Sequence, residues 1–91
     1  MAYVSTTAWV AKLFVSERTR QKIATKHRLD VYEIGREVLC VEGLRGKWDE
    51  HPERGLRLLV KVRIRDLSML VVLYPRGKDE WDLGSAYPIR T

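Results

Sequence analysis

The residues of this chain best suited to chemistry on phosphate are its two histidines, His27 and His51. An imidazole exchanges protons near neutral pH, so it can take the proton from a hydroxyl that attacks phosphorus. His51 lies in a polar segment beside Pro52, and it is the stronger candidate for a general base because loops carry function more often than helix ends do. His27 closes a predicted helix, where the helix dipole alone accounts for a basic residue.

Arg76 is a candidate for stabilising the charge that develops on a reacting phosphate. It stands in a Pro-Arg-Gly turn directly after an apolar run, and a guanidinium there can hold a phosphate through two parallel hydrogen bonds. The alternative interpretation is a solvated turn residue. Cys40, the only cysteine, excludes an internal disulfide and a zinc site of several thiolates, and we interpret it as a buried small hydrophobe.

A row of basic side chains is the strongest local signal. In the segment 56–65 apolar and basic residues alternate, with about 7 Å between alternate positions, and the basic face holds Arg57, Lys61, Arg63 and Arg65. RNA could lie across this row, in agreement with a net charge of +5. The alternative is that these cations are the solvent-exposed half of an antiparallel strand and protect it from aggregation.

The elements that must position these residues form a single domain over 1–91, because the chain is too short for a second core. Thr7–Val15 alternates like a strand, and Ser16 then offers an N-cap to a helix over Glu17–His27. Asp30 and Glu33 have the spacing of a capping box, which predicts a second helix directly after the first.

The second half of the chain is predicted to be strands. Gly43–Gly55 is rich in Gly, Pro and charge, which indicates a turn or a long connection. Three sequential strands follow, over 56–65, Met69–Tyr74 and 80–89. The prediction is therefore an α+β fold of order β-α-α-β-β-β, with an N-terminal strand and two helices packed on a small antiparallel sheet.

The sequence shows no sign of a membrane or a cofactor. No basic run leads into an apolar segment at the N-terminus, and no apolar stretch approaches the ~18 residues of a membrane span, so we expect a cytoplasmic protein without a membrane partner. A glycine-rich phosphate loop and a His-Glu-x-x-His motif are both missing from the sequence, and we expect neither a metal nor another cofactor.

Several short motifs together resemble the small toxins of bacterial toxin-antitoxin pairs. Lys26-His27 leads through a short turn into an amphipathic helix, His51-Pro52-Glu53-Arg54 precedes a strand, and MLVVLYPRG (69–77) is followed by EWDLGSAY (80–87). The nearest similarity is to BrnT-like proteins within the wider RelE/ParE-like group. Where BrnT-like sequences usually have Ser-Ala-Arg at the end of the last strand, this chain has Ser85-Ala86-Tyr87.

This resemblance implies a toxin that cleaves messenger RNA without a metal and is neutralised by a cognate antitoxin. The resemblance and the residue types together assign the catalytic roles to Arg76, His51, Glu53 and Arg63. RNA binding is assigned to Lys26, His27, Arg54, Arg57, Lys61, Arg65 and Tyr87. The alternative is a binding module without catalysis, either a ParE-like toxin that grips a protein target or an RNA-binding relative.

Overall fold

The computed structural model describes residues 5–89, which form six strands and two helices. The strands are β1 (Ser5–Ala8), β2 (Lys12–Phe14), β3 (Leu44–His51), β4 (Gly55–Ile64), β5 (Leu67–Gly77) and β6 (Glu80–Pro88), and the helices are α1 (Glu17–His27) and α2 (Val31–Val38). All strands belong to one sheet of order β1-β3-β4-β5-β6-β2, in which only the β2–β6 pairing is parallel. The predicted α+β class is confirmed.

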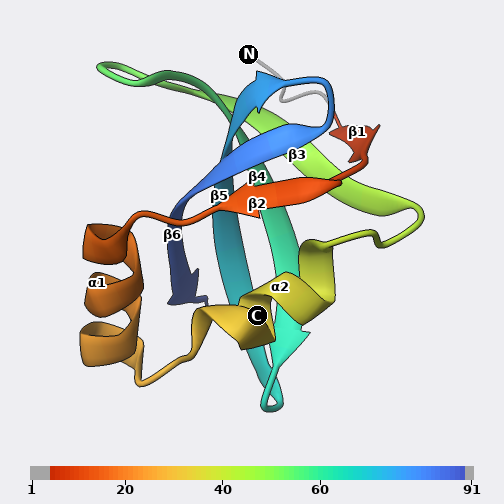
Figure 1. The fold of residues 1–91 in the computed structure, drawn as a ribbon. Coiled ribbons are helices and arrows are strands. Elements are labelled where there is room, and N and C mark those ends of the chain that lie inside the picture. Colours follow the sequence, from red (N-terminus) through yellow and green to blue (C-terminus); the bar gives the residue numbers. More distant parts are fainter. Residues whose placement is uncertain (1–4, 90–91) are drawn as a thin grey trace.

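The sheet is strongly curled. β1 and β2 lie at opposite edges of the sheet, although only residues 9–11 separate them, so the sheet wraps round until one short connection reaches both edges (Figure 1). Val10, in that connection, is fully buried. Inside the curl the rings of Trp48 on β3 and Trp81 on β6 stack with their centroids 6.0 Å apart. Strands that are not neighbours in the sheet therefore share one core.

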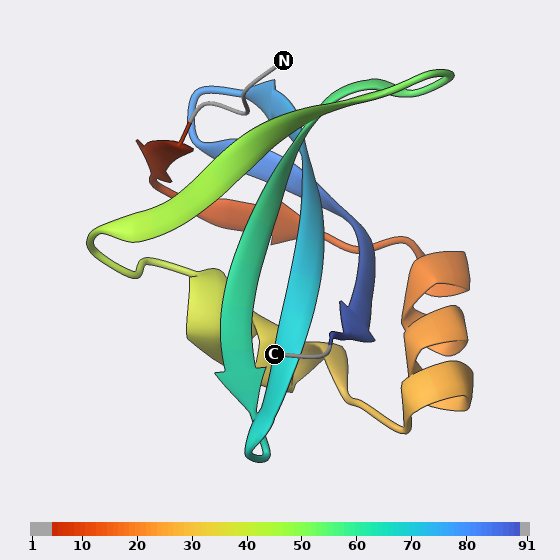
Figure 2. The ribbon, with the colours of Figure 1, turned by 180° about the vertical axis from the view of Figure 1, so that it is seen from behind.

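The core fills the inner face of the curl and is closed by the helices, which both lie toward the same end of the molecule (Figure 2). Strand alternation turns Leu58 and Val60 of β4 inward, and α2 covers them with Ile34 and Val38, all fully buried. α1 buries only Ile23. α1 therefore presents most of its surface, including its cations, to solvent.

Both helices begin where the sequence predicts. The Ser16 hydroxyl accepts a hydrogen bond from the Thr19 N–H at 3.1 Å, which satisfies a free donor in the first turn of α1. Asp30 and Glu33 form the predicted capping box at the start of α2, where Asp30 accepts from the Tyr32 N–H at 2.9 Å. These local signals fix the two helix starts independently of the sheet.

The predicted sheet was wrong in size and in strand direction. The segment expected to be a turn, 43–55, contains β3, whose charged residues are the outer half of a strand alternation that buries Leu44 and Gly46. Gly46 is needed there because a Cβ would lie 2.8 Å from the Leu58 Cγ. The single strand predicted over Thr7–Val15 is two strands in the structure, β1 beside β3 and β2 beside β6, at opposite edges of the sheet. Because β2 and β6 are parallel, the sheet is mixed and not purely antiparallel.

The prediction for Cys40 was also wrong. α2 ends at Val38, and Cys40 is exposed in a left-handed conformation with φ of 54°. Its N–H donates to the Val10 carbonyl at 2.9 Å, which ties the end of the helix to the connection between β1 and β2.

Over residues 5–89, neither helix has the length and apolar character needed to cross a membrane.

Candidate nucleic-acid interface

A groove between α1 and β6 collects several of the residues singled out in the sequence. It has a volume of about 300 Å³, and its polar lining consists of Lys22, Lys26, His27, Ser85 and Tyr87. Helix periodicity places Lys22 and Lys26 one turn apart on the same side of α1. Ser85 and Tyr87 alternate onto one face of β6 across from them. The Lys26-His27 and Ser85-Ala86-Tyr87 motifs are thus brought together.

His27 in this groove has free ring nitrogens, as far as the described residues show. It is half-buried at the last position of α1, before Arg28 caps the helix in a left-handed conformation. Within residues 5–89 its ring makes no hydrogen bond. An imidazole with both nitrogens available, flanked by ammonium groups, can exchange a proton with a ligand that the lysines hold.

His51 has a different environment at the end of β3. Its Nδ1 accepts hydrogen bonds from the backbone N–H groups of Glu53 and Arg54, each at 3.1 Å, so this nitrogen is already used as an acceptor. The neutral ring then carries its proton on Nε2 and offers only a donor to a ligand. His51 shapes the β3–β4 turn, and Glu53 lies exposed in that turn.

A second basic region lies on the outer face of the sheet. It is a pocket of about 330 Å³ whose cations are Arg45, Lys47 and Lys61 and whose apolar part is Leu59 and Leu70. We call these five residues the basic patch. The sequence predicted Lys61 but missed Arg45 and Lys47, because their segment was interpreted as a turn. The alternation of apolar and basic residues in LRGKW (44–48) is the signal that could have revealed them.

A third group, the arginine-tyrosine cluster, lies at the end of β4 and β5 that is remote from the α1–β6 groove, and it consists of Arg54, Arg57, Tyr74 and Arg76. The Arg57 guanidinium donates to the Asp49 carboxylate at 2.7 Å, and this hydrogen bond raises the pKa of Arg57. The Arg54 guanidinium lies over the Tyr74 ring, 5.0 Å from its centroid. Arg54 and Arg57 are thus already engaged within the protein.

Arg76 lies within β5, not in the turn that the sequence predicted, and it stands at the β2 edge of this cluster. Its guanidinium lies 4.0 Å from the centroid of the Phe14 ring and 3.4 Å from the Asp82 carboxylate. Asp82 and Tyr87 are five residues apart on β6, which separates them by about 16 Å. The structure therefore does not bring Arg76 together with the α1–β6 groove.

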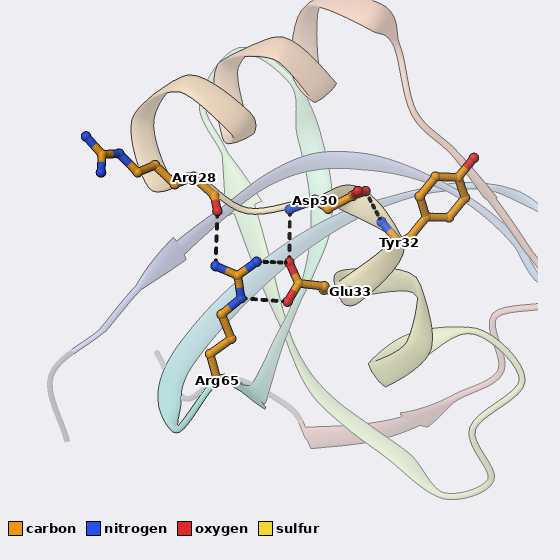
Figure 3. A network of polar contacts seen from close by, with 5 residues as sticks. All are labelled: Arg28, Asp30, Tyr32, Glu33 and Arg65. Carbon is orange, nitrogen blue, oxygen red and sulfur yellow. Dashed lines mark hydrogen bonds and ion pairs between the residues drawn. The ribbon is translucent and has the colours of Figure 1, made fainter.

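The alternation in the sequence predicted that Arg65 shares a face with Arg63 and Lys61. In the structure it does not. Arg65 and Asp66 both adopt positive φ in the tight β4–β5 turn, which takes Arg65 out of the strand alternation. It donates to both Glu33 oxygens, at 2.7 and 2.8 Å, and to the Arg28 carbonyl at 3.3 Å (Figure 3). The two hydrogen bonds from Arg65 lower the pKa of Glu33, and all three bonds fasten the turn to the start of α2.

Arg63 remains exposed on β4, next to the basic patch. Its guanidinium makes a long hydrogen bond of 3.3 Å to the Asp66 carbonyl and no ion pair with any described residue.

Among residues 5–89, no three His, Cys, Asp or Glu side chains gather as metal ligands would. A scan of family models and searches of curated proteins and of solved structures found no match to this chain.

Proposed function

We propose that this protein is an RNA-cleaving toxin whose active site is the α1–β6 groove. The observation that supports the proposal is the meeting of His27, with its free ring nitrogens, and the ammonium groups of Lys22 and Lys26 in one groove. The sequence resemblance to bacterial toxins supplies the biological class. The basic patch on the adjacent sheet face supplies a surface of the right charge for a polyanion.

The proposed reaction is an intramolecular transesterification that needs no metal. The ribose 2′-oxygen attacks the adjacent phosphorus and its proton passes to His27, while the P–O5′ bond breaks and the leaving 5′-oxygen takes up a proton from the solvent. His27 then returns its proton to the solvent, so the net change is the transfer of one proton from the 2′-oxygen to the 5′-oxygen. The products are a 2′,3′-cyclic phosphate and a 5′-hydroxyl, so atoms and charge balance without water. Lys22 and Lys26 stabilise the negative charge that builds on the phosphoryl oxygens. Tyr87 lies at the rim, where its ring can stack on a base.

The experiment is incubation of the purified protein with RNA in EDTA, followed by analysis of the fragment ends. We expect fragments with a cyclic phosphate, and we expect no cleavage at a position where the 2′-hydroxyl is replaced by hydrogen. Intact RNA that nevertheless stays bound to the protein would instead support the binding module.

The proposed partner is an acidic antitoxin encoded beside this protein. A protein of net charge +5 attracts an acidic partner electrostatically, which accelerates association. Expression of the protein alone should inhibit growth, and co-expression of the neighbouring reading frame should relieve the inhibition. Harmless expression of a folded protein would contradict the toxin assignment.

A further inference from the structure

The basic patch combines two chemistries in one concavity. Arg45 and Lys47 project from β3 and Lys61 from β4, while Leu59 and Leu70 form an apolar floor between them. In the sheet Lys47 pairs with Leu59 and Lys61 pairs with Leu70, so these two cations each stand beside an apolar side chain of the neighbouring strand. A ligand that fits must therefore offer anionic groups and an apolar surface close together.

The three cations are not neutralised by the part of the chain that the structure describes. Within residues 5–89 the ion pairs involve Arg20, Arg57, Arg65 and Arg76, and none of them involves Arg45, Lys47 or Lys61. Like charges held this close repel one another, so the patch raises the energy of the free protein slightly and favours an anion. A phosphate bound here would displace no carboxylate.

The patch is continuous with the α1–β6 groove. Lys61 pairs with Leu70 on β5, and Leu70 pairs with Tyr87 on β6, which lines the groove. Two strand spacings separate Lys61 from Tyr87, about 10 Å. A single nucleic-acid strand covers that distance with a few nucleotides, and Tyr87 lies between the two regions.

We propose that the basic patch is a binding subsite for single-stranded RNA that flanks the segment held in the α1–β6 groove. Arg45, Lys47 and Lys61 contact phosphates, and an unpaired base lies on the floor of Leu59 and Leu70. A double helix hides its base faces in the stack and cannot use this floor, whereas a single strand can. The inference rests on the proposed function only for the identity of the polyanion.

The test is a binding experiment with 2′-O-methyl RNA, which cannot be cleaved because it lacks the attacking hydroxyl. One probe of about ten nucleotides spans both regions, and one of about three fills the groove alone. We expect the double variant Arg45→Gln/Lys61→Gln to bind the longer probe about tenfold more weakly. Its logarithmic salt slope should fall by about 1.4, or 0.7 for each lost phosphate contact. Affinity for the short probe should stay unchanged.

The matched control is Lys12→Gln/Arg36→Gln, which removes the same charge from exposed positions on β2 and α2. A longer probe that binds the patch variant no more weakly than this control would overturn the proposal. Unchanged RNA binding together with lost binding of polyglutamate would overturn it too, and would assign the patch to an acidic protein. Lys47→Glu, a single charge reversal, repeats the test should the double variant fold poorly. Because the probe cannot be cut, failure here is distinct from failure of the cleavage assay.

Discussion

The α1–β6 groove and the arginine-tyrosine cluster contain similar residues, but they differ in how many of those residues are already bonded. In the cluster, Arg57 binds Asp49, a carboxylate whose side chain is only 13% exposed, and Arg54 stacks on Tyr74. In the groove, His27 and Lys26 have no such partner among residues 5–89. The charges of the cluster are bonded within the sheet, whereas those of Lys26 and His27 in the groove are not bonded to other described residues.

The same difference separates the two histidines. A ligand that needs the Nδ1 of His51 must break two backbone hydrogen bonds, which leaves both N–H groups of the turn without an acceptor. A ligand at His27 breaks no hydrogen bond that the described residues make. Its position in a polar segment made His51 the stronger candidate from the sequence, whereas the contacts within the fold favour His27. The two histidines have the same side chain, and they differ in whether a ring nitrogen already accepts hydrogen bonds from the backbone.

The largest expected effect is the loss of RNA cleavage in His27→Gln. Removing a proton-transferring group costs about 100-fold or more in rate, so single-turnover cleavage should fall by at least that factor while thermal stability is retained. The matched change His51→Gln should keep the cleavage rate within about twofold and lower the free energy of unfolding by about 1 kcal/mol, because the turn loses its acceptor. Full activity in a folded His27→Gln protein would contradict the comparison.

A change in the cluster should affect stability and spare RNA binding. The Tyr74 ring packs directly on Gly84, so a methyl group at that position would overlap the ring. We expect Gly84→Ala to lower the free energy of unfolding by about 1–3 kcal/mol, since the ring must move and Arg54 loses its partner. Chemical denaturation measures the change, and a fluorescence titration with uncleavable RNA serves as the control. Weakened RNA binding in this variant would show that the cluster belongs to the interface.

The smallest expected effect comes from the Arg65–Glu33 contact, and it depends on pH. Arg65 holds the pKa of Glu33 below its ordinary value of 4.5. The lowered pKa means that this contact adds stability above pH 4.5 and that the contribution is lost as the pH falls through the lowered value. Glu33→Gln should therefore melt slightly below wild type at neutral pH, and the two melting temperatures should converge in acid. A difference in melting temperature that stays constant across this pH range would show that the protonation of Glu33 is not linked to stability.

Local signals allowed the helices and most strands to be predicted, but not the closure of the sheet. Ser16 and the Asp30–Glu33 box act over three residues, so the sequence reveals them directly. The split of the first strand depends on pairing with β3 and β6, which lie far along the chain. β3 was not predicted because it contains glycine and many charged residues. A strand with one solvent-exposed face can therefore resemble a loop in composition.

The candidate site was only partly predictable for a related reason. The sequence points to the Lys26-His27 pair and to Tyr87 as two separate motifs, and the packing of α1 on β6 brings them together. Arg65 followed the alternation in the sequence, yet the positive φ of a two-residue turn redirected it. The sequence shows residue types and spacing along an element, whereas contacts between elements decide which residues stay free.

The most direct test of the central claim, that the groove and not the cluster binds RNA, is amide chemical-shift mapping. Uniformly ¹⁵N-labelled protein is titrated with uncleavable single-stranded RNA, and the shifts are plotted on the structure. If this claim is right, the largest changes fall at Lys26, His27 and Tyr87, with smaller changes over the basic patch and none at the β3–β4 turn. Shifts concentrated at His51, Glu53 and Arg76, with the groove unchanged, would contradict it.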